Sequence, residues 1–475
     1  MASADARLIS ATRIDDVTTP VAAYLKLVKD HENCFLLESV EGGSFRGRYS
    51  AIGMDPDLIW TVRDGKPFLQ NLASNAEPVS DGADPIASLK SLNASSAIAL
   101  EPGTPSIASG LFGYVGYDLI RAIEPLPDTQ NPDPAGIPEA CLIRPRTVIV
   151  FDALKQEITA YRRLAYDGDR SVADAELAAL LSQLDYPFEP REAARPADIK
   201  PVSSFEKDAY LDDVNRLKEH IRAGDIFQGV LSQRFTTAFH LPPFSLYRAL
   251  RRLNPSPFLF HFQFQGYAIT GSSPEILVRV RDGVVTVRPI AGTRPRGETP
   301  ADDNALEADL LADPKERAEH MMLLDLGRND VGRVAKPGSI RITEREIVER
   351  YSHVMHIVSN VEGDLAEKQD AISALFAGFP AGTVSGAPKV RAMQILDEIE
   401  PHRRGYYAGA AGYFSADGNM DMAIALRTAL IKDGQMSVQA GAGIVLDSNP
   451  EAEHQECLNK ARALFRAAEQ AHRFV

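Results

Sequence analysis

The chain has 475 residues, of which 44% are hydrophobic and 24% charged, as in soluble globular proteins, and its length allows two or three domains. Its formal net charge of −14 argues against binding to nucleic acid or to an anionic membrane surface, and its three cysteines are too few for a disulfide framework or a zinc site. The first sixteen residues lack the apolar stretch of a signal peptide, and no apolar run approaches the roughly 20 residues of a membrane span, so we expect a cytoplasmic protein.

A proline-rich stretch divides the chain. Residues 187–201 contain four prolines among charged residues, which is typical of a linker. We therefore expect an N-terminal domain over residues 1–186 and a larger C-terminal domain over residues 202–475.

The C-terminal part predicts both helices and antiparallel strands. Ser203-Ser-Phe-Glu206 has the form of a capping box, and an apolar stripe at helical spacing follows it. Strands are then predicted over 257–264, where phenylalanine occupies every second position, and over 267–271, 276–280 and 284–290, with Asp282-Gly283 as a hairpin turn. Antiparallel strands mixed with helices indicate an α+β fold.

Two Glu-x-x-Glu pairs lie far apart in the chain. Glu316 and Glu319 belong to a predicted helix over 314–326, and Glu453 and Glu456 to one over 450–468. The spacing of three places both carboxylates of a pair on one helix face, and four carboxylates that met there would need a cation such as Mg²⁺. Most such pairs only face water, however, and Glu316 also has the position of a capping-box residue after Asp313 and a proline.

Three loops offer groups for catalysis or binding. Gly271-Ser-Ser-Pro-Glu275 joins two predicted strands, and Glu275 is either a general acid held on a turn or a solvated side chain. Residues 289–297 combine Gly292 and Thr293 with the cations Arg294 and Arg296, which suits a ligand or an ordinary loop. Residues 378–389 are rich in glycine but lack the spacing of a phosphate loop; they fit the entry to a helix, whose N-terminus favours an anion.

Two further segments are ambiguous by themselves. Residues 439–444, Gln-Ala-Gly-Ala-Gly-Ile, expose backbone N–H groups, as many strand ends do. His356 alternates with apolar residues in a predicted strand over 353–359, where a histidine is more often structural than catalytic, although it titrates near neutral pH.

Taken together, these motifs resemble the chorismate-utilising enzymes and, within them, the anthranilate synthase component I family. The resemblance covers nearly the whole chain. It is strongest over residues 271–275, 290–297, 316–330, 353–359, 379–389, 425–428, 439–444 and 453–460. It implies an α+β fold with two intertwined, antiparallel-rich sheet layers flanked by helices and with the active site between them.

The resemblance also assigns roles to individual residues. It implies that Glu319 and Glu456 bind Mg²⁺ directly, with Glu316 and Glu453 around the ion through water. It implies that chorismate, a dicarboxylate, is bound by cations, hydroxyls and backbone N–H groups. The implied substrate-binding residues are Gly292, Thr293, Tyr407, Arg427, Gly441, Ala442, Gly443 and Lys460.

The implied reaction adds ammonia at ring C2 while the C4 hydroxyl leaves, and then eliminates pyruvate. Glu275 resembles the acid that protonates the leaving hydroxyl, and His356 the histidine of the elimination phase. Relatives that add water carry a lysine base at the position of Gln228, and aminodeoxychorismate synthases typically carry a nucleophilic lysine at that of Ala291. Glutamine and alanine at these two positions favour anthranilate synthase.

The N-terminal part resembles an allosteric tryptophan site. Hypothesised contacts are Leu37, Glu38, Ser39, Ser50, Asn254, Pro255, Pro257, Phe258 and Leu259. The cysteines do not lie in a glutaminase nucleophile motif, so glutamine-dependent activity would require a separate amidotransferase subunit in a hetero-oligomer. The alternatives are an aminodeoxychorismate synthase, a non-catalytic tryptophan-binding relative and a Mg²⁺-dependent phosphoryl-transfer enzyme.

Overall fold

The computed structural model describes residues 6–28, 31–39, 47–74, 77–127, 131–188, 193–194, 199–351 and 354–475. Part of the predicted linker lies outside these ranges, as does His353 at the start of the predicted strand 353–359. Within the described ranges, no helix is both long and apolar enough to cross a membrane.

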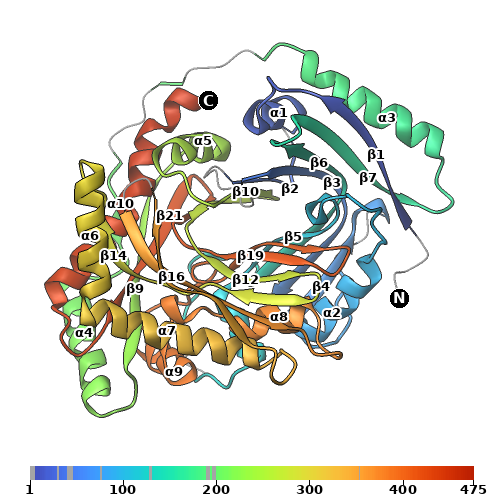
Figure 1. Cartoon of the computed structure of the whole chain (residues 1–475). Helices are drawn as coiled ribbons and strands as arrows, with labels where there is room; N and C mark the ends of the chain where they lie inside the picture. The colour runs from blue at the N-terminus through green and yellow to red at the C-terminus, as the bar shows by residue number, and fades with distance from the viewer. Residues whose placement is uncertain are drawn as a thin grey trace.

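The strands form one hydrogen-bonded network, and every strand pairing within the described ranges is antiparallel (Figure 1). The strands are β1 Ala6–Ile14, β2 Cys34–Glu38, β3 Tyr49–Arg63, β4 Lys66–Asn71, β5 Gly110–Val115, β6 Ala140–Asp152, β7 Glu157–Ala165, β8 Val202–Ser203, β9 Gln228–Ala238, β10 Phe258–Phe264, β11 Tyr267–Ser273, β12 Ile276–Arg281, β13 Val284–Val287, β14 Ile290–Pro295, β15 Arg341–Arg350, β16 Val354–Asp364, β17 Gly386–Ala387, β18 Ala410–Ser415, β19 Met420–Ile424, β20 Thr428–Lys432 and β21 Gln435–Ile444.

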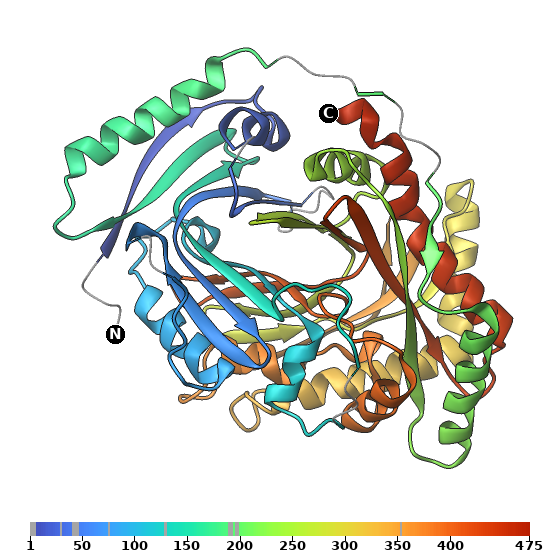
Figure 2. The same ribbon diagram turned by 180° about the vertical axis from the view of Figure 1, so that it is seen from behind.

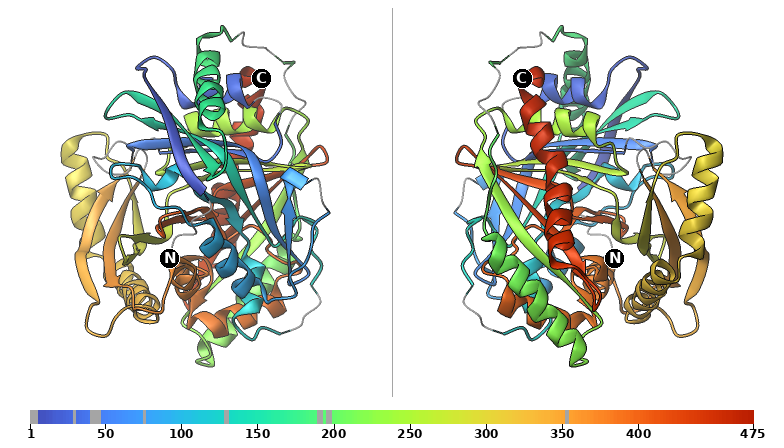
Figure 3. Two further views of the ribbon diagram at one scale, coloured as in Figure 1. Left: turned by 90° about the vertical axis from the view of Figure 1, so that its right-hand side faces the viewer. Right: turned by 90° about the vertical axis from the view of Figure 1, so that its left-hand side faces the viewer.

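Helices cover the outer faces of these strands. The helices are α1 Pro20–Leu27, α2 Pro85–Ser96, α3 Arg170–Ser182, α4 Lys207–Arg222, α5 Pro243–Leu253, α6 Pro300–Ala312, α7 Pro314–Gly332, α8 Ala371–Gly378, α9 Lys389–Ile399 and α10 Pro450–Gln470. Helices α5 and α10 pack side by side against β9, β11, β20 and β21, as the view from behind shows (Figure 2). Helices α6 and α7 gather with β14–β16 at one side of the molecule (Figure 3).

Strands from the two sides of the predicted linker pair with each other. Strand β2 pairs with β10, and β5 pairs with β18. The largest hydrophobic core cluster likewise combines Trp60 and Phe112 from the N-terminal part with Phe262 and Met422 from the C-terminal part. The prediction of an α+β fold with intertwined antiparallel layers is confirmed, whereas the division into domains 1–186 and 202–475 stays a prediction.

Alternation of apolar residues predicted the central strands well. Phe260, Phe262 and Phe264 enter the core on one face of β10, while Phe258 at the strand start is half-buried. The segment predicted as one strand over 284–290 is instead two strands, β13 and β14. Both pair with β16, so that the loop assigned to 289–297 is largely sheet.

The predicted capping box at the start of α4 is wrong. The helix begins at Lys207, with Glu206 at the N-cap position and without a side-chain capping bond. The Ser203 hydroxyl instead donates to Gln233 Oε1 at 2.9 Å, across to β9. The Ser203 oxygen accepts from the Phe205 N–H at 3.0 Å, in a turn that precedes the helix.

Candidate active site

Glu275 lies on the turn between β11 and β12, and its side chain is buried. The Thr383 hydroxyl donates to Glu275 Oε1 at 3.0 Å. Burial raises the pKa of Glu275 to about 8, against the opposing effects of the Thr383 hydrogen bond and the charges of Arg427 and Lys460. A carboxyl group that is protonated at neutral pH and held on a rigid turn is suited to general acid catalysis.

His356 lies on β16 opposite Thr293 of β14. Its Nδ1 is 2.9 Å from the Gly292 carbonyl oxygen and 3.1 Å from the Thr293 hydroxyl. A proton on Nδ1 satisfies that carbonyl and leaves Nε2 as the acceptor. Burial lowers the pKa of His356, and the charge of Arg427 adds to this effect, so the ring is neutral near pH 7.

Gly292 allows this arrangement because it adopts a left-handed conformation, with φ of 72°. The register of β14 against β16 shifts at this residue, from Ala291 opposite Ile357 to Thr293 opposite His356. The bulge turns the Gly292 carbonyl oxygen towards the imidazole. The approach of Gly292 to a ligand stays a prediction.

Arg427 connects the general-acid candidate with the histidine. It lies between β19 and β20 with φ of 46°, and its charge acts on both Glu275 and His356. Its carbonyl oxygen accepts a hydrogen bond from the Ser272 N–H at 3.2 Å. A guanidinium whose charge reaches both groups is suited to a substrate carboxylate.

Strand β21 carries Gly441, Ala442 and Gly443, and one edge of the strand at these residues pairs with β9. The Tyr407 hydroxyl packs against Gly441, and the Gln228 amide packs against Gly443. The side chain of Ala442 points the other way, into the core beneath α4 and α9. Lys460 Nζ donates to the Gly441 carbonyl oxygen at 2.8 Å, and so all the predicted backbone contacts lie on one strand.

The two glutamate pairs act on each other electrostatically. Burial raises the pKa of Glu319, and the charges of Glu316 and Glu456 add to the shift, while a hydrogen bond from Gln228 opposes it. Burial also raises the pKa of Glu453, again with a contribution from Glu456. Carboxylates of α7 and α10 that repel one another supply the hard oxygen donors that Mg²⁺ prefers.

Cations from the chain contact these carboxylates directly. Glu456 forms an ion pair with Lys460 at 2.7 Å, and Glu316 with Arg294 at 3.3 Å. Within the described ranges, no group of three or more His, Cys, Asp or Glu side chains is arranged closely enough to hold a metal ion. Glutamate side chains are nevertheless oxygen donors of the type that a divalent cation prefers. The predicted capping role of Glu316 is wrong, because the Asp313 side chain alone accepts the first N–H groups of α7.

Some assignments from the sequence differ from what the structure shows. Arg294 and Arg296, which the sequence offered as ligand-binding cations, pair instead with carboxylates of α6 and α7, including Asp303 and Asp313. Lys389 is buried and pairs with Asp330 through both carboxylate oxygens at 2.9 Å. These cations hold elements together around the site.

Thr383 is the site residue that the sequence reasoning missed. It belongs to the short 3₁₀ helix Gly382–Val384, between α8 and α9, within the segment 378–389 that had drawn attention for its glycines alone. The only indication in the sequence was that Thr383 places a hydroxyl group within this glycine-rich segment.

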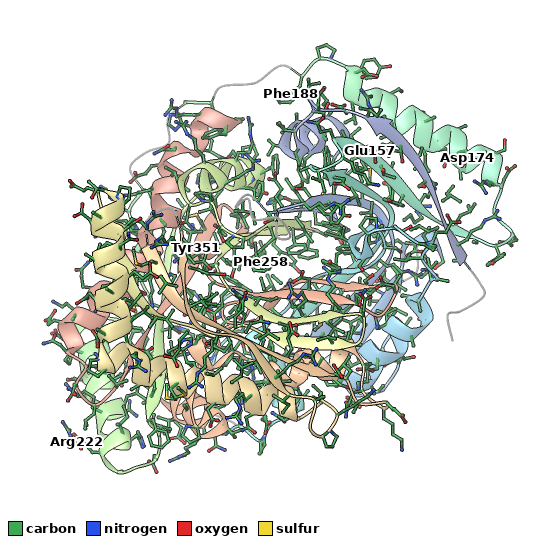
Figure 4. All side chains as sticks on the ribbon, viewed as in Figure 1. Glu157, Asp174, Phe188, Arg222, Phe258 and Tyr351 are labelled. Carbon is green, nitrogen blue, oxygen red and sulfur yellow. The ribbon has the colours of Figure 1, made fainter. Side chains whose placement is uncertain are left out.

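The residues of the predicted tryptophan site come from adjacent strands and one loop. Leu259 of β10 lies opposite Glu38 of β2, and Leu37 lies opposite Ala51 of β3, next to Ser50. Phe258 starts β10 (Figure 4). The loop before it carries Asn254, Pro255 and Pro257.

Two polar groups in this set differ in their surroundings. The Glu38 carboxylate accepts hydrogen bonds from Tyr247 at 2.5 Å and from Arg251 at 2.8 and 3.0 Å. The Ser39 hydroxyl is buried and has no hydrogen-bond partner among the described residues. Glu38 is thus held in place by α5.

Comparisons with known proteins agree along the whole chain. Residues 32–466 match the chorismate binding enzyme family. The chain is 53% identical to anthranilate synthase component 1 of Cereibacter sphaeroides, covering 99% of this chain and 96% of that protein, and 48% identical to the same component of Pseudomonas putida, covering 97% and 94%. The crystal structure of anthranilate synthase component I from Streptococcus pneumoniae is similar with a TM-score of 0.81 at 36% identity, covering 95% of this chain and 98% of that one.

Proposed function

The chain belongs to the chorismate binding enzyme family, and on that premise we propose that it converts chorismate and ammonia to anthranilate and pyruvate, the first committed step of tryptophan biosynthesis in the cytoplasm. The observation that carries the proposal is that the charge of Arg427 acts both on Glu275, a buried acid with a raised pKa, and on His356, whose pKa is lowered. A cationic side chain near a protonated acid and a neutral base suits a dicarboxylate substrate.

Glu275 protonates the C4 hydroxyl of chorismate, which then leaves as water while ammonia forms a bond to C2. The elimination of pyruvate breaks the bond between C3 and the ether oxygen, and the loss of the C2 proton makes the ring aromatic. His356 takes up that proton at Nε2, because Nδ1 is committed to the Gly292 carbonyl oxygen. Gln228 is a neutral amide that cannot deprotonate water, and Ala291 cannot form a covalent adduct.

Glu319 and Glu456 would hold Mg²⁺ directly, with Glu316 and Glu453 around it, and the ion supplies positive charge for the ring carboxylate. Gly441, Ala442 and Gly443 offer backbone N–H groups, and the substrate also contacts Thr293, Tyr407 and Lys460. Ammonia comes from a glutamine amidotransferase subunit that forms a hetero-oligomer with this chain, since the named relatives are called component 1. Tryptophan binds near Ser39 and inhibits the enzyme.

The test is an assay with chorismate, Mg²⁺ and an ammonium salt at mildly alkaline pH, with the product identified by mass spectrometry. Anthranilate supports the proposal, whereas 4-amino-4-deoxychorismate would show an aminodeoxychorismate synthase and no turnover would show a non-catalytic relative. Glu275→Gln should lower kcat by about 10²- to 10⁴-fold and leave chorismate binding nearly intact. The matched control is Glu451→Gln, on the exposed face of α10, which should behave as wild type.

A further inference from the structure

We propose that Thr383 is a positioning residue for Glu275: its hydroxyl holds Oε1 as a hydrogen-bond acceptor, so that Oε2 carries the proton delivered to the leaving hydroxyl. The inference rests on the general-acid role proposed above for Glu275. Its basis is the 3.0 Å hydrogen bond from Thr383 Oγ1 to Glu275 Oε1, which joins the α8–α9 connection to the turn after β11.

The turn that carries Thr383 is held from two sides. Gly382 packs so closely against α7 that a Cβ at this position would lie 2.0 Å from a methyl carbon of Leu326. On the other side, Arg404 Nη1 donates to the Val384 carbonyl oxygen at 2.7 Å, and Arg404 itself is buried in an ion pair with Glu400. A hydroxyl on such a fixed turn can define the orientation of the carboxyl group that it contacts.

The hydrogen bond makes the two oxygens of Glu275 inequivalent. A protonated carboxyl has one O–H donor and one carbonyl acceptor, and without an external donor the proton can sit on either oxygen. The donor at Oε1 assigns the proton to Oε2. Because catalysis depends on the orientation of the transferred proton, a displacement of about 1 Å can cost about 10²-fold in rate.

The same bond also affects the protonation equilibrium. Arg427 and Lys460 act on Glu275 through their charges and, like the Thr383 donor, favour the carboxylate, while burial favours the neutral acid. Removal of the Thr383 donor therefore raises the pKa of Glu275 further. Since an acid catalyst must be protonated, the loss of activity at alkaline pH should then begin at a higher pH.

The test compares Thr383→Val, which keeps the shape but removes the donor, with Thr383→Ser, which keeps the donor. Thr383→Val should lower kcat by about 10- to 100-fold, change the KM for chorismate little and move the alkaline limb of the kcat–pH profile to higher pH. Thr383→Ser should keep the wild-type profile. Thr12→Val removes a threonine hydrogen bond of 2.9 Å on β1 and serves as the matched control, expected to match wild type.

Infrared difference spectra give a readout that does not depend on turnover. The carbonyl band of protonated Glu275, assigned by its disappearance in Glu275→Gln, should shift to higher frequency in Thr383→Val and stay in place in Thr383→Ser. An unshifted band together with an unshifted pH profile in Thr383→Val would overturn the inference even if kcat fell. Full activity of Glu275→Gln would instead refute the general-acid role, so the two failures are distinguishable.

Discussion

Asn254 and Ser272 exchange two hydrogen bonds: the Asn254 amide donates to Ser272 Oγ at 3.2 Å, and the Ser272 hydroxyl donates to the Asn254 carbonyl oxygen at 2.5 Å. The loop of the proposed tryptophan site is thereby joined to the end of β11. There the Ser272 N–H donates to the Arg427 carbonyl oxygen. The Ser273 hydroxyl donates to the Glu275 backbone carbonyl oxygen at 3.3 Å.

This connection predicts the effect of Ser272→Ala. Loss of the hydroxyl removes both bonds with Asn254 while the backbone contact with Arg427 remains. At about 0.5–1.5 kcal/mol for each of the two bonds, and with about 1.4 kcal/mol for each factor of ten, we expect the tryptophan concentration for half-inhibition to rise by about five- to 140-fold, with a smaller change in kcat. The measurement is a tryptophan inhibition curve for Ser272→Ala, with Ser182→Ala at an exposed position as the control. An unchanged half-inhibition concentration in Ser272→Ala would contradict the prediction.

Glu275 predicts a dependence of stability on pH. Its pKa is about 8 in the folded protein, above the value of 4.5 for a free side chain, so the folded state binds the proton more tightly. The stabilisation is complete below pH 4.5 and is lost as the pH rises through about 8, at up to about 1.4 kcal/mol per pH unit. Glu275→Gln should therefore have a Tm that exceeds the wild-type Tm increasingly from pH 5 to pH 8. A pH-independent difference in Tm would argue against a buried, neutral Glu275.

The buried pair of Lys389 and Asp330 predicts a loss of stability when one partner is removed. Lys389→Met leaves the Asp330 carboxylate buried without its cation, which typically costs about 3–5 kcal/mol. Urea unfolding should show this loss, and the double variant Lys389→Met/Asp330→Leu should recover much of it. The control is Lys90→Met, because Lys90 is a surface residue that lies 3.8 Å from Asp370 and such pairs contribute about 0–1 kcal/mol. Equal losses in the free energy of unfolding for Lys389→Met and Lys90→Met would contradict this prediction.

The proposed metal site predicts unequal effects of its four carboxylates. Glu319→Gln and Glu456→Gln should abolish most of the dependence of activity on Mg²⁺. Glu453→Gln should instead raise the Mg²⁺ concentration for half-maximal activity by about 10- to 100-fold, as for groups that act through a bound water. Glu451→Gln on the same helix is the control, and calorimetric titration with Mg²⁺ provides a second measurement. Wild-type Mg²⁺ binding by Glu319→Gln would refute the assignment.

Local signals in the sequence located the helices of the glutamate pairs. Asp313 and Asn449, each followed by proline, cap α7 and α10 as predicted. The same type of signal failed at Ser203, because its oxygen accepts from the Phe205 N–H in a turn before the helix and α4 begins only at Lys207.

Contacts between distant segments were beyond reasoning from spacing alone. Nothing local in the sequence indicates that Thr383 contacts Glu275, because the two residues are 108 positions apart and the chain between them must first fold into sheet and helix. The ion pairs of Arg294 were hidden for a related reason: its three carboxylate partners lie in or between the helices that follow it in the chain. The prediction that the two glutamate pairs meet at one site came from the resemblance to a family. Helical periodicity alone could not predict it.

The pairing of β2 with β10 and of β5 with β18 has a consequence for synthesis of the chain. Strands β2 and β5 leave the ribosome before their partners β10 and β18 have been synthesised. Until then, one edge of each strand has no partner. Open strand edges and exposed apolar surface make such waiting chains prone to aggregation. A fragment that ends near the linker would keep that exposure permanently, and a chaperone that shields strand edges during translation should raise the yield of the full chain.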